Sequence, residues 1–315
     1  MTTRPNDDRE FDELEARLRI LLPEQYQDSY DEVLPVPMRS AGLKYGSEGK
    51  VAWDEIWGSF CDLAMAGGPS HKGTLLEPGG SKEIKKQSLR YREVVDEICR
   101  GIHMVTGLGV EQSPMPGWAR VYCTSAAMSG WLVRAITMEN VAAISKGLVL
   151  YLPAGPGYRL EKEIKNVVTV MAKTSHYWSE HMSPEQHRAI ATLFRKMDSE
   201  SPLVQPALPD PNDPFDHRET FPGNAAASIS QATGLAVSER SYAGWFGLEC
   251  LEVRAAVWMM RMFAGCNVLS RREGTVVFVP VNAASDPDGE VVAGVVRKAY
   301  RLAVARNIFQ TPPAN

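Results

Sequence analysis

The chain contains no run of about 18 uncharged apolar residues, which a membrane-spanning helix would require. A strong excess of charge is also missing, because 34 Lys and Arg stand against 38 Asp and Glu, for a net charge of −4. A protein that binds nucleic acid through bulk positive charge is therefore not expected. Segment 1–12 is polar and acidic, so it does not have the apolar centre of a secretory signal. Together these absences predict a cytoplasmic protein with neither a membrane nor a nucleic-acid partner.

Cysteine is sparse, and its spacing shows no pairing. The sequence has an odd number of cysteines, five, which are widely separated and form no CxxC pair: Cys61, Cys99, Cys123, Cys250 and Cys266. A disulfide framework or a zinc site normally leaves a closer and more regular spacing. The pattern predicts reduced thiols.

The length and composition allow a large hydrophobic core. The chain has 315 residues, of which 44% are hydrophobic and 23% charged, as in ordinary globular proteins. Four successive segments are expected. They are an N-terminal helical segment with a His-Lys loop (1–88), a first repeat unit (89–180), a helix with a proline-rich connector (181–223), and a second repeat unit (224–315).

An internal similarity defines the two repeat units. Residues 106–153 align with residues 233–280 without a gap at an offset of 127, and 14 of the 48 positions are identical. Random pairing would give about three identities at ordinary residue frequencies. The identities include the rare pairs Trp118 with Trp245 and Cys123 with Cys250. The sequence therefore predicts an internal duplication.

Each unit is expected to have the order α-β-α-β-β-α, which places the protein in the α/β class with a mixed sheet. In the first unit we expect a helix at 89–105, a strand at 119–123, a helix at 125–138, a hairpin at 141–152 and a closing helix near 160–178. The β-α-β step favours parallel neighbouring strands, and the hairpin adds an antiparallel one. The two units are expected to form one body about a pseudo-twofold axis, with extra N-terminal helices.

Additional helices are expected outside the repeats. A leucine-rich stripe indicates a helix over 7–33, interrupted at Pro23. A second stripe indicates a helix over 52–66. Ser183 and Pro184 are typical of a helix start, with Gln186 placed for a capping box.

The residues shared by the two units have mainly architectural explanations. Gly147 and Gly274 are expected in tight turns, and Asn140 and Asn267 in left-handed helix caps. The other shared residues are Trp131, Trp258, Arg134 and Arg261. Burial in the core is favoured for both tryptophans over stacking on a ligand. For both arginines, interaction with the helix dipole is favoured, and paired anion binding is the alternative.

Two short loops resemble each other and provide the candidate site. Both read Pro, then His, a cation, any residue and Thr, which gives the candidate residues His71, Lys72, Thr74, His217, Arg218 and Thr220. In a functional site the histidines would exchange protons in catalysis, the cations would hold an anion, and the threonines would orient the ligand. Two solvated turns are the alternative.

The histidines near position 180 do not predict a metal site. His176 and Glu180 are four residues apart on one helical face, and His181 and His187 follow. Their spacing matches neither HExxH nor HxxEH. A polar helix end is the favoured interpretation, so no metal is expected.

These patterns predict a protein that binds a small anionic metabolite in a cleft between the two units. An enzyme with His general acid–base chemistry is one form of that function. A non-catalytic interaction or regulatory subunit that holds a protein partner is the alternative. The sequence identifies no cofactor and no oligomeric state.

Overall fold

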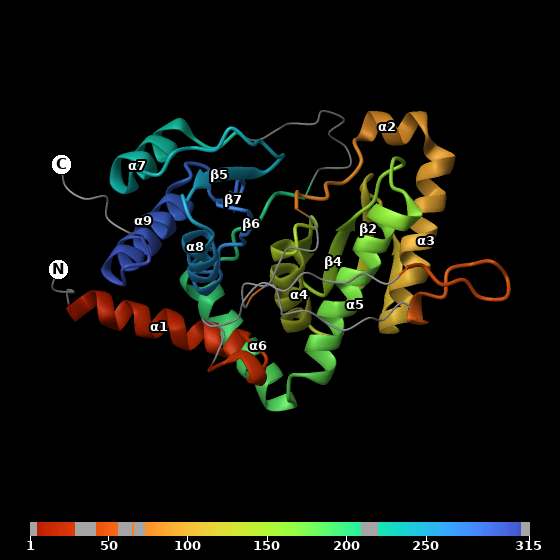
Figure 1. The fold of residues 1–315 in the computed structure, drawn as a ribbon, viewed down its shortest axis with the longest axis horizontal. Coiled ribbons are helices and arrows are strands. Elements are labelled where there is room, and N and C mark those ends of the chain that lie inside the picture. Colours follow the sequence, from red (N-terminus) through yellow and green to blue (C-terminus); the bar gives the residue numbers. More distant parts are fainter. Residues whose placement is uncertain (1–4, 29–41, 56–64, 66–72, 209–219, 310–315) are drawn as a thin grey trace.

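The structure is a computed structural model, and it describes residues 5–28, 42–55, 65, 73–208 and 220–309. These residues form a mixed α/β fold with two small antiparallel sheets (Figure 1). The α-helices are α1 (Pro5–Leu21), α2 (Ser81–Lys86), α3 (Ser88–Thr106), α4 (Ala126–Met138), α5 (Lys165–Glu180), α6 (Pro184–Glu200), α7 (Gly223–Thr233), α8 (Val253–Gly265) and α9 (Glu290–Ala305). Short helical turns occur at η1 (Glu24–Tyr26), η2 (Trp53–Glu55) and η4 (Leu160–Ile164).

The first sheet has the strand order β1-β2-β4-β3, and the second has the order β5-β7-β6. Their strands are β1 (Gly109–Gln112), β2 (Trp118–Tyr122), β3 (Ile144–Lys146), β4 (Val149–Pro153), β5 (Trp245–Glu249), β6 (Arg271–Glu273) and β7 (Val276–Pro280). Every neighbouring pair is antiparallel, so the expectation of parallel neighbours is wrong. The second strand of each hairpin folds back and pairs with the preceding strand, as β4 does with β2 and β7 does with β5. It therefore occupies the edge at which a parallel strand would have to pair.

The elements of the aligned segments have the same order and matching bounds. β2, α4, β3 and β4 begin and end 127 residues before β5, α8, β6 and β7, respectively. The strand registers match as well, because Trp118 pairs with Pro153 and Trp245 pairs with Pro280. The first sheet differs by one additional strand, β1, which the sequence analysis did not predict.

The two sheets lie in different parts of the molecule, and helices cover both (Figure 1). α3 packs on α5 beside the first sheet, and α8 packs on β7 and α9 beside the second. Helix α1 contacts α6, α8 and α9, so the N-terminal helix is fixed to the second sheet's helices. The buried hydrophobic residues form one core cluster that spans both parts.

Several element bounds differ from the sequence-based expectations. Helix α1 ends at Leu21, so the expected interruption at Pro23 is observed, and only Glu24–Tyr26 form a short helical turn after it. Positions 29–33 of the expected helix lie outside the described residues. Most of the expected helix over 52–66 lies outside the described residues, and Trp53–Glu55 form a short helical turn. Helix α6 begins at the expected position, and the Ser183 side chain accepts a hydrogen bond from Gln186 N. The Gln186 side chain donates to Leu22 O, so it does not form the second half of the expected capping box. No helix in the described ranges is long and apolar enough to cross a membrane.

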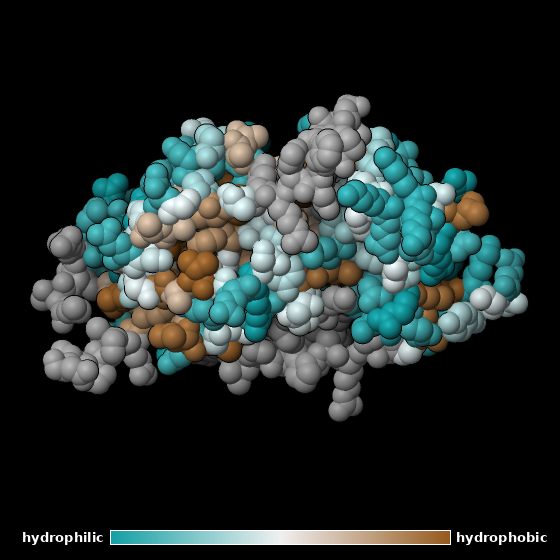
Figure 2. All heavy atoms as spheres, turned by 90° about the horizontal axis from the view of Figure 1, so that it is seen from above, coloured by the Kyte–Doolittle hydropathy of each residue, from teal (hydrophilic) through white to brown (hydrophobic). Residues whose placement is uncertain are grey.

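The surface differs between the two ends of the molecule. Seen from above, apolar residues gather over the part that contains α7 and α9, whereas the opposite end over α2 and α3 is mainly hydrophilic (Figure 2). The lysines of α2 are exposed.

Candidate functional site

Two of the six predicted site residues can be placed. Thr74 and Thr220 are both exposed in irregular segments. His71, Lys72, His217 and Arg218 lie outside the described residues. The proposed roles of these four side chains stay predictions.

Each of the two threonines precedes a residue that contacts the second sheet. Leu75 N donates to Glu273 Oε1 in β6 at 3.1 Å, and the Phe221 ring stacks on Phe246 of β5 with centroids 4.3 Å apart. Because β6 and β5 flank β7, Thr74 and Thr220 stand next to opposite edges of the same sheet. A common ligand for the two loops stays a prediction.

Glu273 of β6 is the centre of a buried polar cluster. Its carboxylate accepts hydrogen bonds from Arg271 Nη1 at 2.6 Å, Tyr242 OH at 3.0 Å, Leu75 N at 3.1 Å and Arg240 Nη1 at 3.3 Å. The Arg271 and Glu273 side chains are 0% and 1% exposed. Removing such an ion pair from water is costly, so its partners must be held closely in place. We refer to these five residues as the Glu273 cluster.

Arg271 is enclosed by aromatic rings. Its guanidinium carbon lies 3.9 Å from the Phe278 ring centroid, 4.4 Å from that of Tyr242 and 5.2 Å from that of Trp245. Burial lowers the pKa of Arg271, while the Glu273 carboxylate opposes that shift. Arg271 Nη1 donates a hydrogen bond to Glu273, but Nε and Nη2 have no hydrogen-bond acceptor among the described residues. Buried donors without acceptors are uncommon, and each one requires an explanation.

The Glu273 cluster reaches solvent through Arg240. The Arg240 side chain is 54% exposed, whereas the Glu273 carboxylate that it contacts is buried. Tyr242 is partly exposed beside it, and burial together with its bond to Glu273 raises the pKa of the Tyr242 hydroxyl. The cluster therefore connects the core with the surface through one cation and one phenol.

The two cap asparagines link the aligned segments to each other. Asn140 and Asn267 have φ of 57° and 62°, so both adopt the expected left-handed conformation. Asn140 Oδ1 accepts a hydrogen bond from Arg271 Nη1 at 3.1 Å, and Asn267 Oδ1 accepts one from Arg134 Nη2. Each asparagine is thus bound by an arginine of the other segment, a role that the sequence analysis did not foresee.

Arg134 does not interact with the end of its helix as expected. Its Nη1 donates to Gly130 O at 2.5 Å, one turn back along α4, and its guanidinium carbon lies 4.2 Å from the Phe194 ring centroid. Burial lowers the pKa of Arg134 to about 10, and the charge of Asp198 opposes the shift. The dipole interpretation is wrong for Arg134 because the side chain turns into the contact with α6 and Asn267.

A second buried ion pair lies next to Asn140. Lys173 Nζ of α5 donates to Glu139 Oε1 at 2.5 Å, and these side chains are 2% and 1% exposed. Burial lowers the pKa of neighbouring Arg272, and Glu139 opposes that shift. Buried charge therefore concentrates where the turn after α4 meets β6.

Two short connecting segments reinforce this junction. Leu76 forms a parallel bridge with Val141, and Val204 forms one with Val268. Val141 and Val268 are themselves an identical pair at the offset of 127. The chain before each aligned segment thus approaches the turn after that segment's helix in the same way.

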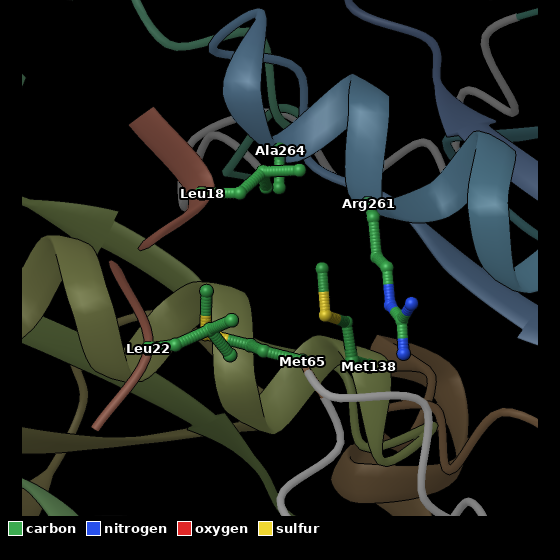
Figure 3. A pocket seen from close by; sticks show the side chains of 6 residues that line it. All are labelled: Leu18, Leu22, Met65, Met138, Arg261 and Ala264. Atoms are coloured by element: carbon green, nitrogen blue, oxygen red, sulfur yellow. The ribbon is translucent and has the colours of Figure 1, made fainter. Parts of the chain in front are cut away.

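A small cavity lies near the junction, between α1, α4 and α8. Its volume is about 10 Å³, and Figure 3 shows its lining of Leu18, Leu22, Met65, Met138, Arg261 and Ala264. Arg261 extends from α8 toward Met138 of α4 (Figure 3). The space suits about one water molecule, so the cavity is too small for a metabolite.

The predicted core positions of the paired tryptophans are confirmed. Trp131 is 0% and Trp258 is 8% exposed. Trp131 Nε1 donates to Leu21 O at 2.7 Å, and Trp258 stacks on Phe11 with centroids 6.4 Å apart. Both therefore also hold the N-terminal helix and the turn after it.

The Glu273 cluster is not among the predicted site residues, although the sequence contains a signal for it. Three consecutive charged residues, Arg271, Arg272 and Glu273, occur in the predicted second hairpin, directly before its turn glycine, Gly274. Charges at such positions suggest either an exposed edge or a buried ionic site, and alternation alone cannot separate the two. Comparison of the chain with family models, with curated proteins and with solved structures finds no match.

Proposed function

We propose that residues 106–153 and 233–280 are two copies of one unit, related by a pseudo-twofold axis. The matching element bounds and the matching strand registers support this proposal. An experimental structure in which the two segments fail to superpose would contradict it.

We further propose that the protein binds a small anionic metabolite at the contact between the two units. The observation that carries the proposal is Arg271, a fully buried guanidinium with Nε and Nη2 unused by any acceptor in the described ranges. Guanidinium groups bind carboxylates and phosphates through such paired donors. A ligand anion would reach these donors by displacing the partly exposed Tyr242 ring, which lies 4.4 Å from the Arg271 guanidinium carbon.

Arg240 and Tyr242 would guide the ligand from the surface. Arg240 presents a partly exposed positive charge, and Tyr242 provides a hydroxyl next to it. The predicted loop ending at Thr74 leads directly into Leu75, which binds Glu273. If the protein is an enzyme, His71 and His217 remain the proposed proton-exchange groups and Lys72 and Arg218 the anion clamps, with Thr74 and Thr220 orienting the ligand.

The proposal can be tested with simple anions. Isothermal titration of the full chain with citrate and with inorganic phosphate would measure affinity, and native mass spectrometry would reveal a retained ligand. The variant Arg240→Gln is expected to weaken binding at least about tenfold, because a charged hydrogen bond contributes roughly 1.5–3 kcal/mol.

Arg188→Gln is the matched control. Arg188 is an exposed arginine paired with Glu185 on α6, outside the Glu273 cluster. Its replacement should leave anion affinity unchanged. Equal affinity of the Arg240→Gln and Arg188→Gln variants for citrate, or no binding of either anion to the unaltered chain, would contradict the proposed site.

A further inference from the structure

The end of helix α5 brings two imidazoles together. His176 lies one residue before the last turn of α5, and His181 is the C-terminal cap residue of that helix. The two Nε2 atoms are 3.1 Å apart, and the ring centroids are 4.9 Å apart with the planes inclined by 74°. Both side chains are half-buried. The pair lies away from the Glu273 cluster in the sequence and on a different element.

The spacing of the two Nε2 atoms suits two kinds of chemistry. A neutral imidazole carries one N–H and one lone pair, so the pair can form a single hydrogen bond. If both Nε2 atoms present their lone pairs, they can instead bind one metal ion. Zinc–nitrogen bonds of about 2.0–2.1 Å at a tetrahedral angle place two ligand atoms about 3.3 Å apart. The distance between the histidine nitrogens is close to that value.

Glu180 is available as a third ligand. It stands four residues after His176 on the same helix and directly before His181, and it is exposed. Its charge raises the pKa of His176, whereas burial, the largest effect, and His181 lower it. In the present side-chain positions no three His, Cys, Asp or Glu groups converge within the described part of the chain, so Glu180 must rotate to complete a site.

The surroundings hold the imidazoles in place. Tyr177 lies between the two histidines in sequence, and its ring centroid is 5.2 Å from that of His181. The Tyr177 hydroxyl is 3.0 Å from the hydroxyl of Tyr26, which fixes the turn after α1 against α5. Ligands that are positioned before binding lose less conformational freedom when the metal arrives.

His187 has a different role. Its ring stacks on Trp178 with centroids 4.1 Å apart, and its Nε2 is 2.8 Å from Trp178 O. These contacts occupy both the face and one nitrogen of the ring. His187 is therefore a packing residue and not a member of the imidazole pair.

We propose that His176 and His181 bind a divalent transition-metal ion such as Zn²⁺ through their Nε2 atoms, with Glu180 as the third protein ligand. Water completes the coordination, because three protein ligands leave an open tetrahedral position. Imidazole and carboxylate donors of this kind suit zinc and its neighbours better than calcium or magnesium.

Cobalt and zinc titrations of the full chain test the site. Co²⁺ bound by two histidines and a carboxylate gives visible absorption bands that Zn²⁺ removes by displacement, and calorimetry gives the Zn²⁺ affinity. His176→Gln and His181→Gln are each expected to reduce that affinity at least about tenfold, because each removes a ligand. Glu180→Gln should reduce it less than either histidine change.

His103→Gln is the matched control, because His103 is an exposed helical histidine outside this pair. Its loss should leave zinc affinity unchanged, and circular dichroism would show that each variant is folded. The proposal is overturned if the three variants at His176, His181 and Glu180 bind zinc as tightly as the unaltered chain, or if the unaltered chain binds no zinc. It is also overturned if His176→Gln lowers the urea midpoint while zinc affinity stays the same, since the pair would then be a structural hydrogen bond only.

Discussion

Strands β3 and β6 occupy matching positions in the two sheets, yet their side chains differ in chemistry and in burial. β3 consists of Ile144, Ser145 and Lys146, and its last residue is exposed. β6 consists of Arg271, Arg272 and Glu273, and all three are buried. The exposed edge carries one charge, and the buried edge carries three.

The elements that cover each strand account for this difference. The neutral amide of Gln205 binds β3, because Gln205 Oε1 accepts from Ser145 N at 3.0 Å and Nε2 donates to Ser145 O at 2.7 Å. Arg240, Tyr242 and the Leu75 amide cover β6 and turn toward Glu273. The position of each strand is thus determined by its hairpin. Whether charged side chains on that strand can be buried depends on the segments that pack over it and supply hydrogen-bond partners.

Replacement of the paired tryptophans is expected to have the largest effect on stability. Trp131→Ala is expected to lower the free energy of unfolding by about 4–5 kcal/mol, because it removes a fully buried ring and its bond to Leu21 O. Trp258→Ala should cost about 3 kcal/mol, since that ring is slightly exposed and stacks on Phe11.

Urea denaturation of the two variants would measure both losses, with Trp131→Phe as a control that keeps most of the ring volume. A loss below about 1 kcal/mol at either position would show that the ring is not part of a packed core.

Lys146 of β3 and Glu273 of β6 occupy matching positions, and replacing each one tests whether burial makes the charge important for stability. Glu273→Gln is expected to destabilise the fold by about 3 kcal/mol, because it leaves the buried Arg271 without its carboxylate partner. Lys146→Gln at the matching position should change stability by less than about 0.5 kcal/mol, since Lys146 is exposed.

Thermal and urea unfolding of both variants would compare these positions directly. Equal effects of the two substitutions would mean that the charges of β6 are not held in a closed cluster.

Replacement of the matching cysteines, Cys123 and Cys250, is expected to have the smallest effect on stability. The effect should be equal at the two positions. Burial raises the pKa of Cys123 and of Cys250 to about 12. A thiol whose pKa is raised in the folded state stabilises the fold fully below its unfolded pKa, and this contribution is lost as pH rises toward 12. Between about pH 9 and 11, each thiol should therefore remove about 1.4 kcal/mol of stability for each pH unit.

Urea midpoints measured from pH 8 to 10.5 would show the effect. Cys123→Ala and Cys250→Ala should each make the decline shallower by the same amount. A decline that neither substitution changes would mean that both thiols titrate normally in the folded protein.

Much of the backbone followed from local patterns. The helix over 89–105 is observed as α3 at 88–106, and the helix over 125–138 as α4 at 126–138, because apolar spacing and caps act over a few residues. The turn glycines Gly147 and Gly274 have φ of 61° and 62°, as a tight turn requires. The direction of strand pairing did not follow, since the choice between a parallel and an antiparallel neighbour depends on where a later hairpin strand folds back.

The candidate site was less predictable than the fold. The sequence pointed to two loops, of which Thr74 and Thr220 are described, and it did not point to Glu273. The partners of Glu273 come from residues 75, 240, 242 and 271, so no short window contains them. The imidazole pair of His176 and His181 has a spacing of five, which matches no familiar metal motif and becomes visible only when His181 folds back over the helix end.

The sequence by itself determined the two matching strand–helix–hairpin segments, their left-handed asparagines and their buried tryptophans. These features depend on neighbours within a helical turn or a hairpin, so the order of residues is enough to specify them. Only the tertiary structure decided that Asn140 and Asn267 would bind arginines of the opposite segment, and that three charges of β6 would be buried. Such contacts join residues more than 100 positions apart. At that separation, local sequence patterns do not indicate which residues lie close together in space.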